Sequence, residues 1–257
     1  FTKGKLLYQL AKYDFKYFLA SYKRDQRWVK QQVLNLTQQQ RQYFFIYLEN
    51  NALPHNATYF YDPYFNNCAT KLRDITKTVL GDKLTFNNSL IKQRLSFREL
   101  MGKEIPWNTW GSFGINLALG NKLDKIANDE EYMYLPDYVY LIFKDSNVLV
   151  DNGSEKLIKR EDVLLNFKEL KQSIAILNPF LIFSILAILG IFATYFDYNR
   201  KKRSKLLDFI MLSTTGILGV LIVFLWFFTN HSTTPNNFNF LWAFAPNFIV
   251  AFLMINN

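Results

Sequence analysis

The chain has 257 residues, a formal net charge of +9 and a mean hydropathy of −0.04, values typical of a soluble protein. The averages hide two compositions, because residues 1–176 hold 25 Lys and Arg with 19 Asp and Glu, whereas residues 177–257 hold 5 and 2. This split excludes a purely soluble protein, and the 50% hydrophobic content excludes a disordered chain. We therefore expect a globular domain over residues 1–176 and a membrane region over residues 177–257.

The first 176 residues mix strand and helix patterns without a βαβ rhythm. Strands are expected at 5–11, 28–34 and 58–61, and helices at 14–22, 37–50, 68–80, 90–101, 111–119 and 136–143. Asn152 and Gly153 predict a hairpin between strands at 148–151 and 156–159, after which residues 161–171 lead into the membrane. This order of elements predicts an α+β fold.

Two uncharged runs in the second part predict transmembrane helices. Residues 179–196 and 209–228 are each about long enough to cross a hydrocarbon core of roughly 30 Å, and a third span begins near residue 241. The loop at 199–205 holds five cations, which the positive-inside rule places in the cytoplasm. Nucleic-acid binding is the alternative reading of such a cluster, but its position between two spans argues against a nucleic-acid partner. Residues 1–176 then face the outside.

The ends of the sequence suggest a longer protein. The chain opens on Phe1 rather than on a methionine, and it stops at Asn257 inside an apolar run. We expect truncation at both ends, so that the third span, at about 241–257, is incomplete and a catalytic partner can lie upstream.

Cys68 is the strongest candidate for a reactive group. It is the only cysteine, so the chain forms no intramolecular disulfide. The aromatic stretch 59–61, the turns at 62–63 and 66–67 and the helix that follows place Cys68 at a helix start, where backbone N–H groups favour a thiolate. Lys71 and Arg73 add positive charge nearby. The alternative is a buried structural thiol, and the residues alone leave both interpretations open.

A thiolate nucleophile normally works with a histidine base, and this sequence offers two histidines. His55 is expected in a surface turn, and His231 begins the loop after the second span, on the same side of the membrane as Cys68. Neither forms a convincing pair with Cys68. Clusters with metal-ligand spacing, glycine-rich phosphate loops and nucleophile-elbow motifs are missing from the sequence, so we expect neither a metal nor a cofactor.

Nearly the whole chain resembles the Lnb-type bacterial lipoprotein N-acyltransferases. Asn67-Cys68-Ala69-Thr70 is one of the motifs that carry the resemblance, and no single motif decides it. The matching stretches, specific in their order and spacing, are residues 3–10, 27–29, 32–37, 51–54, 61–62, 67–70, 73–74, 96–100, 106–107, 113–120, 135–138, 226–231 and 237–242.

The resemblance implies a circularly permuted papain-like thiol domain followed by transmembrane helices, in the bacterial inner membrane with residues 1–176 in the periplasm. Cys68 matches the family's nucleophile, and the base would be a histidine upstream of Phe1. Asn67, Arg73 and His231 become candidates for substrate binding, whereas Asn116 stands where an acidic residue is expected. The implied partners are a phospholipid acyl donor and, as acceptor, the N-terminal amine of a lipoprotein.

Together, the residues and the resemblance predict a ping-pong acyltransferase that passes an acyl chain through a Cys68 thioester. Two alternatives remain open. One is a membrane-tethered cysteine amidase or peptidase of the cell envelope, which shares the thioester chemistry and differs in its acceptor. The other is a non-catalytic envelope interaction module with a structural cysteine.

Overall fold

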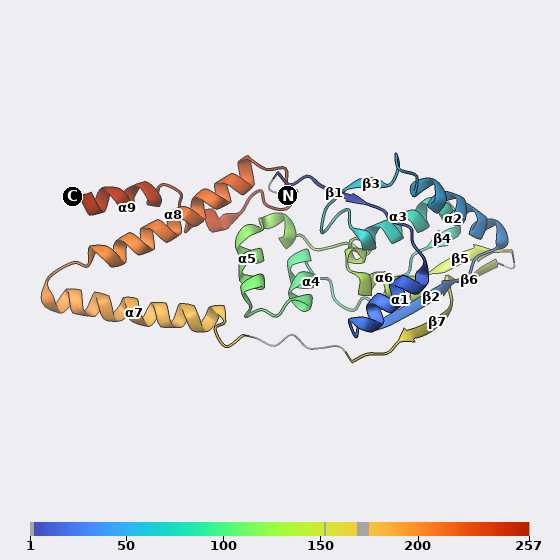
Figure 1. Cartoon of the computed structure of the whole chain (residues 1–257), viewed down its shortest axis with the longest axis horizontal. Helices are drawn as coiled ribbons and strands as arrows, with labels where there is room; N and C mark the ends of the chain where they lie inside the picture. Colours follow the sequence, from blue (N-terminus) through green and yellow to red (C-terminus); the bar gives the residue numbers. More distant parts are fainter. Residues whose placement is uncertain (1–2, 152, 169–174, 257) are drawn as a thin grey trace. The chain divides into compact units, whose positions relative to one another are not determined.

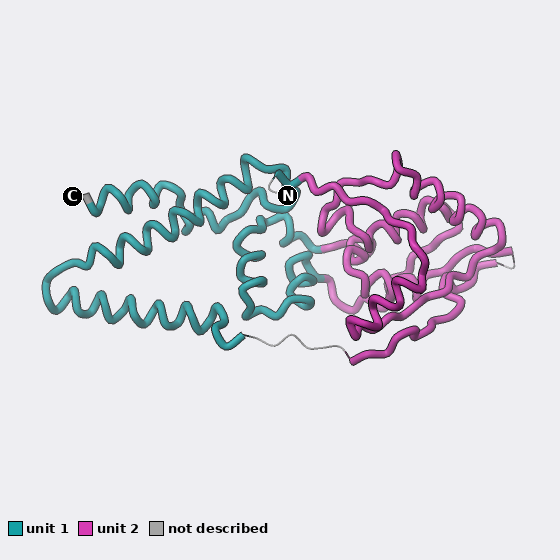
Figure 2. Tube along the Cα trace, in the orientation of Figure 1, with its two compact units in different colours: residues 1–4, 95–126, 172–257 teal, residues 5–94, 127–171 magenta. Residues whose placement is uncertain are grey.

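The computed structural model describes residues 3–151, 153–168 and 175–256. They form two compact units, which Figure 2 draws in different colours. Unit 1 holds residues 1–4, 95–126 and 172–257, and unit 2 holds residues 5–94 and 127–171. A segment from the middle of the sequence therefore packs with the C-terminal region. The domain border at residue 176 remains a prediction.

The strands of unit 2 form small antiparallel sheets rather than one large sheet (Figure 1). Two of the sheets join segments that are far apart in the sequence; for example, Gln31 donates a hydrogen bond to Asp162, 131 residues away. The pairs are β1 (Leu6–Gln9) with β3 (Thr58–Tyr61), β2 (Val29–Leu34) with β7 (Ile158–Leu165), and β5 (Asn147–Val150) with both β4 (Leu84–Thr85) and β6 (Gly153–Lys156).

Local start signals in the sequence mark the beginning of several helices of unit 2. At α2 (Gln38–Asn51), the Gln40 N–H donates to Thr37 Oγ1 and the Gln40 side chain bonds back, which is a capping box. Proline stands first in α6 (Pro136–Asp145), where its missing N–H costs nothing. The described residues of unit 2 also form α1 (Phe15–Arg24), α3 (Cys68–Leu80), η1 (Gly81–Lys83) and η3 (Glu131–Tyr134).

The core of unit 2 lies where α3, α6 and β5 meet. The Tyr132 ring is fully buried, and its hydroxyl donates to the Gln93 carbonyl at 2.6 Å, so the buried phenol is satisfied. The other buried apolar side chains include Ile75, Leu80, Met133, Val139, Ile142, Phe143, Val148 and Leu157. This core fixes α3, and with it the start of the helix at Cys68.

Unit 1 contains the long apolar helices. α7 (Pro179–Arg200) and α8 (Lys205–Phe227) are long and apolar enough to cross a membrane, and only 6% and 17% of their apolar windows are buried. A core helix of a soluble protein would be mostly covered, so the exposure favours a lipid environment. The described residues of unit 1 also form α4 (Phe97–Glu104), α5 (Trp110–Ala118), η2 (Asn121–Asp124), η4 (Phe238–Leu241) and α9 (Asn247–Asn256).

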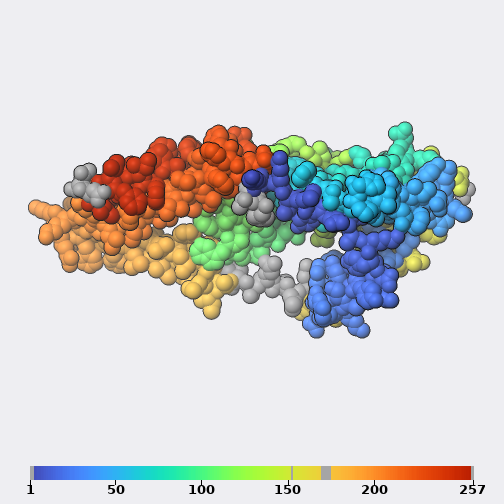
Figure 3. Space-filling view, turned by 45° about the horizontal axis from the view of Figure 1, so that its top comes forward, coloured from blue at the N-terminus to red at the C-terminus, as the bar shows by residue number. Residues whose placement is uncertain are grey.

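Two glycines let α8 approach the segment that ends in α9. A Cβ atom on Gly216 would lie 2.2 Å from the Phe248 nitrogen, and one on Gly219 would lie 2.2 Å from the Ala243 oxygen. Membrane helices use small residues for such close backbone contact. In the space-filling view, the orange and red side chains of α8 and α9 accordingly lie against one another (Figure 3).

Most of the expected elements occur, some with shifted ends. The prediction of a helix at 90–101 is wrong in its first half, because α4 begins only at Phe97. Ser96 caps α4 and forms an isolated β-bridge with Ile126. The hairpin occurs, but its second strand is β6, since Val150 pairs with Gly153. Residues 158–165 form β7 rather than a link to the membrane. Near the third predicted span, a 3-10 turn at Phe238–Leu241 precedes α9, which begins at Asn247.

Glu161 joins three elements of unit 2. Its carboxylate on β7 accepts hydrogen bonds from Lys144 of α6 at 2.6 Å and from Gln32 of β2 at 3.0 Å. The hydrogen bond from Lys144, followed by that from Gln32, lowers the pKa of Glu161 from 4.5 to about 2. The charged form is therefore the one that the folded protein stabilises.

Replacing Glu161 by Gln should lower the stability of unit 2 by about 1 kcal/mol at neutral pH, because solvent screens part of this interaction. A carboxyl whose pKa falls on folding contributes its stability above the unfolded value, and the contribution is lost as the pH falls towards 2. Thermal unfolding should thus separate wild type from Glu161→Gln at pH 7, and the gap should close between pH 4.5 and 2. A gap that does not change with pH would contradict this.

Gly120, just after α5, contacts the backbone of the loop that follows α8. Its N–H donates to the Thr233 carbonyl at 2.8 Å, and a Cβ atom there would lie 1.8 Å from the Pro235 oxygen. The neighbouring Asn121 N–H donates to the Asn236 carbonyl at 3.1 Å. The end of α5 and this loop are thus in backbone contact.

We expect Gly120→Ala to destabilise unit 1 by about 3 kcal/mol, because the clash is with backbone that no side-chain rotation can relieve. Gly114→Ala in α5 is the matched control, since a Cβ atom there meets nothing within 4 Å. It should be neutral or stabilise the helix by up to about 1 kcal/mol. Thermal unfolding in detergent micelles, followed by circular dichroism, makes the comparison. Equal melting of the two variants would contradict the packing.

Candidate active site around Cys68

A tight loop leads the chain from β3 into α3. Asp62 Oδ1 accepts hydrogen bonds from the backbone N–H groups of Tyr64 and Phe65 at 2.9 and 3.0 Å. Asp62 and Asn66 also exchange both of their backbone hydrogen bonds, which closes the loop. The Asp-Pro turn expected from the sequence is therefore a side-chain-supported turn. It delivers Asn67 and Cys68 to the helix start.

Asn67 fixes that start. Its Oδ1 accepts from the N–H groups of Ala69 and Thr70, both at 2.9 Å, and its Nδ2 donates to the carbonyls of Pro63 and Tyr134 at 2.8 and 2.9 Å. The side chain is buried, and both of its polar atoms are used inside the protein. The geometry is that of a residue that positions Cys68, since it ties the cap of α3 to the core.

Cys68 is the first residue of α3, and it is exposed. This location argues against a buried structural thiol. Asn67 occupies the N–H groups of Ala69 and Thr70, whereas among the described residues the Cys68 N–H has no hydrogen-bond partner. An exposed thiol beside a free N–H at a helix start is a suitable arrangement for a nucleophile.

Three tyrosines share one face of the β1–β3 pair near Cys68. The Tyr8 ring stacks on Tyr61 at 4.2 Å between centroids, and Tyr8 lies opposite Tyr59. Burial raises the pKa of the Tyr59 and Tyr61 phenols above 10.0, and a negative charge on Cys68 raises it further. Both phenols therefore keep their protons at neutral pH and can donate hydrogen bonds. Lys71, one turn after Cys68, holds its ammonium 5.0 Å from the Tyr59 ring centroid.

The side chain of Arg73 is held by hydrogen bonds that link α3 to a neighbouring loop. Its guanidinium bonds to the Asp74 carboxylate at 2.7 Å and donates to the Glu130 carbonyl at 3.0 Å. Lys77 pairs with the Glu130 carboxylate at 2.7 Å, so two cations of the helix hold the same loop. The side chain of Arg73 is only 15% exposed. Its predicted role in substrate binding remains a prediction.

An apolar pocket of about 360 Å³ opens beside the same helix. Leu72 lines it one turn after Cys68, and Ile75 continues the wall. Further lining residues come from β2, α2 and α6, among them Leu34, Phe44, Leu48, Val139 and Phe143. The volume and the apolar lining are typical of a small ligand site.

The two histidines do not pair with the thiol in the described residues. His55 lies exposed in the turn between α2 and β3, as expected, and no hydrogen bond joins it to Cys68. His231 belongs to unit 1, where its Nδ1 lies 2.8 Å from Thr229 Oγ1. That hydroxyl donates its proton to the Leu225 carbonyl at 2.7 Å, so Nδ1 is the donor towards Thr229 Oγ1.

Comparison with known protein families gives two matches. Residues 1–111 match the model of the Lnb N-terminal periplasmic domain, and residues 171–257 match that of the Lnb transmembrane domain. The chain belongs to the Lnb family. No curated protein and no solved structure matches it.

Family membership confirms the coarser predictions. The Lnb chain is a membrane protein with a periplasmic segment, its fold mixes helices and strands, and its domains indicate a protein that acts in lipoprotein biogenesis. The periplasmic match contains Cys68, Asn67 and Arg73, whereas His231 lies in the transmembrane match.

Sequence reasoning missed the tyrosine face and the role of Asn67. The alternation of Tyr59 and Tyr61 is a signal that could have placed both on one strand face, but Tyr8 joins it through pairing between segments about 50 residues apart. An asparagine directly before a helix is a recognisable cap signal. The hydrogen bonds from Asn67 Nδ2 to the carbonyls of Pro63 and Tyr134 depend on the tertiary fold, so the sequence does not reveal them.

Proposed function

We propose that this Lnb chain is part of a thiol acyltransferase of the bacterial inner membrane. It moves an acyl chain from a phospholipid through a Cys68 thioester to the N-terminal amine of a lipoprotein. The observation that carries the proposal is the exposed thiol of Cys68, held at the first position of α3 by the buried Asn67 in a periplasmic Lnb domain.

The reaction proceeds in two half-reactions. A histidine upstream of Phe1 takes the proton of Cys68, and the thiolate attacks the ester carbonyl of the phospholipid. The C–O bond breaks, the proton passes to the departing lysophospholipid, and a thioester remains on Cys68. The lipoprotein amine then attacks the thioester, loses a proton and forms an amide, which restores the thiol.

The surroundings of Cys68 support the attack on an ester. The Cys68 N–H is one donor for the oxyanion, since those of Ala69 and Thr70 are held by Asn67. A protonated phenol, Tyr59 or Tyr61, is the second donor that we propose. Of the backbone N–H groups at the start of α3, the one that we propose for binding the oxyanion is therefore that of Cys68.

The remaining candidates receive narrower roles. The apolar pocket that begins at Leu72 accepts the acyl chain. Arg73 positions α3 through Asp74 and Glu130. His231, held by Thr229, contributes to binding the polar part of a lipid substrate. The loop 199–205 lies in the cytoplasm.

The test uses the full-length protein in liposomes whose phospholipid carries an isotope-labelled acyl chain, with a purified diacylglyceryl lipoprotein as acceptor. Mass spectrometry of the lipoprotein N-terminus should show one added labelled acyl chain, and a lysophospholipid should accumulate in equal amount. A cleaved peptide bond without added acyl mass would instead indicate an amidase or peptidase. An unchanged lipoprotein and phospholipid would reject the proposal.

A further inference from the structure

Residues 105–121 form a run of 17 residues without a charge, inside the part of the chain expected to be a water-exposed domain. This run is too short to span a bilayer, and its helix, α5, has only nine residues. Two of its tryptophans are open to the surroundings, since Trp107 is 74% exposed and Trp110 is 46% exposed. Tryptophan is typical of the boundary between lipid headgroups and acyl chains.

The run is attached to the first turns of α7. The Trp110 indole N–H donates to the Leu177 carbonyl at 2.8 Å, and the N–H of Phe180 donates to Asn108 Oδ1 at 3.0 Å. Further in, the Phe113 ring lies 5.1 Å from that of Phe183. Phe183 is one turn beyond Pro179, which corresponds to about 6 Å along the helix.

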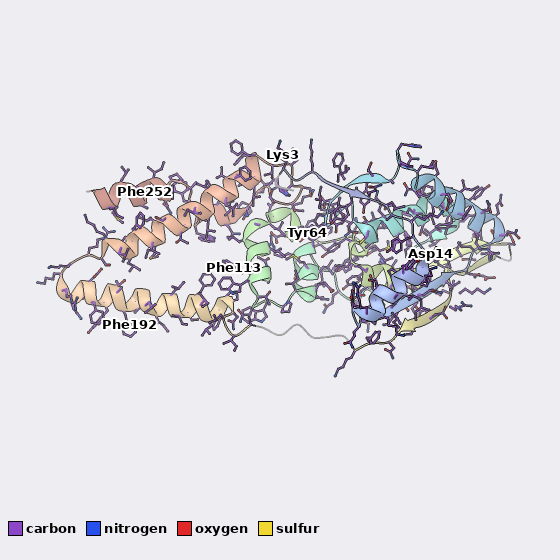
Figure 4. All side chains as sticks on the ribbon, viewed as in Figure 1. Lys3, Asp14, Tyr64, Phe113, Phe192 and Phe252 are labelled. Atoms are coloured by element: carbon purple, nitrogen blue, oxygen red, sulfur yellow. The ribbon has the colours of Figure 1, made fainter. Side chains whose placement is uncertain are left out.

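The other side of the run is attached to the chain that follows α8. Asn237 Nδ2 donates to the Leu117 carbonyl at 2.8 Å, and the Gly120 N–H donates to Thr233. The N-terminal end of α7 and the C-terminal end of α8 are at the same membrane surface if both helices cross. Figure 1 shows α5 at this end of the two helices, opposite the loop that joins them, and Figure 4 shows Phe113 on the side of α5 towards them.

We propose that residues 105–119 lie in the outer leaflet of the membrane, with Trp107 and Trp110 among the lipid headgroups and Phe113 about one helical turn deeper. Three observations agree: the run is uncharged, its exposed side chains are indoles, and it is bonded at both ends to the outer ends of two apolar helices. The depth is that of an interfacial helix, about 5–10 Å. The placement is independent of the acyl transfer proposed for Cys68.

Site-specific labelling in a background without native cysteines gives a direct test. In the full-length protein with Cys68→Ser, we would attach a nitroxide spin label to Trp107→Cys and, as the matched control, to Lys125→Cys in the same unit. Both proteins are placed in lipid nanodiscs. The label at 107 should collide several-fold more with oxygen, which concentrates in lipid, than with a water-soluble nickel complex, and the label at 125 should show the reverse.

Two results would overturn the proposal. A label at 107 that the nickel complex reaches as freely as at 125 would place Trp107 in water. A label that neither reagent reaches would mean that protein covers the site. As a second readout that keeps the Trp107 side chain, a variant with Trp107 as its single tryptophan should lose its fluorescence in brominated lipid; unchanged emission there would also overturn the proposal.

Discussion

Replacing Cys68 by Ala should abolish N-acylation of the lipoprotein while leaving the protein folded and inserted. Without the sulfur no thioester can form, and loss of an enzyme's nucleophile lowers turnover by on the order of 10⁴-fold or more. The thiol is exposed, so its removal should change the free energy of unfolding by less than about 0.5 kcal/mol. The measurement is the initial rate of labelled acyl transfer in liposomes.

The conservative variant Cys68→Ser sharpens this comparison. The hydroxyl keeps the size of the side chain but is a much weaker nucleophile, so only traces of activity should remain. Melting of both variants at the wild-type temperature would separate lost chemistry from lost structure. Turnover above one tenth of the wild-type rate in Cys68→Ala would contradict the assignment of the nucleophile.

Asn67→Ala should have the largest effect on stability of any substitution at the site. It removes the cap of α3 and the two hydrogen bonds that Asn67 Nδ2 donates to the carbonyls of Pro63 and Tyr134. The loss of a cap costs about 1 kcal/mol, and each lost buried hydrogen bond costs about 1 kcal/mol. We expect a destabilisation of about 3 kcal/mol and a matching loss of activity, measured by thermal unfolding and by acyl transfer below the new melting temperature.

Two further variants distinguish the capping role of Asn67 from its hydrogen bonds to the carbonyls of Pro63 and Tyr134. Asn66→Ala is the matched control, because the side chain of this neighbouring asparagine donates one hydrogen bond, to the Phe60 carbonyl; it should cost about 1 kcal/mol. Asn67→Asp keeps the cap but turns a negative oxygen towards two carbonyls and places a charge beside the thiolate. Its activity should fall more than its stability does. Equal melting of Asn66→Ala and Asn67→Ala would refute the special role of Asn67.

Local signals predicted the helix start at Cys68 correctly. The turns at 62–63 and 66–67 and a helical pattern up to Leu80 are contained in about 20 residues, and the structure has α3 at Cys68–Leu80. The same holds for the long apolar helices, because composition alone sets their length.

Long-range pairing explains what the sequence did not reveal. β7 forms because Ile158–Leu165 pairs with β2, near the N-terminus. The local sequence of β7 does not indicate which strand is its partner. Similarly, Arg98 holds Asp124, Asn116 and the Gly120 carbonyl, which gathers residues 95–126 into unit 1. Such contacts depend on the whole fold, and they decide which part of the chain the membrane region packs with.

The most direct test of the proposed chemistry is to capture the acyl-enzyme. Full-length protein incubated with phospholipid, but without the lipoprotein acceptor, should gain the mass of one acyl chain in intact-protein mass spectrometry. Neutral hydroxylamine should release that mass, and peptide mapping should place it on Cys68. An unmodified protein, or an acyl group on another residue, would contradict the account.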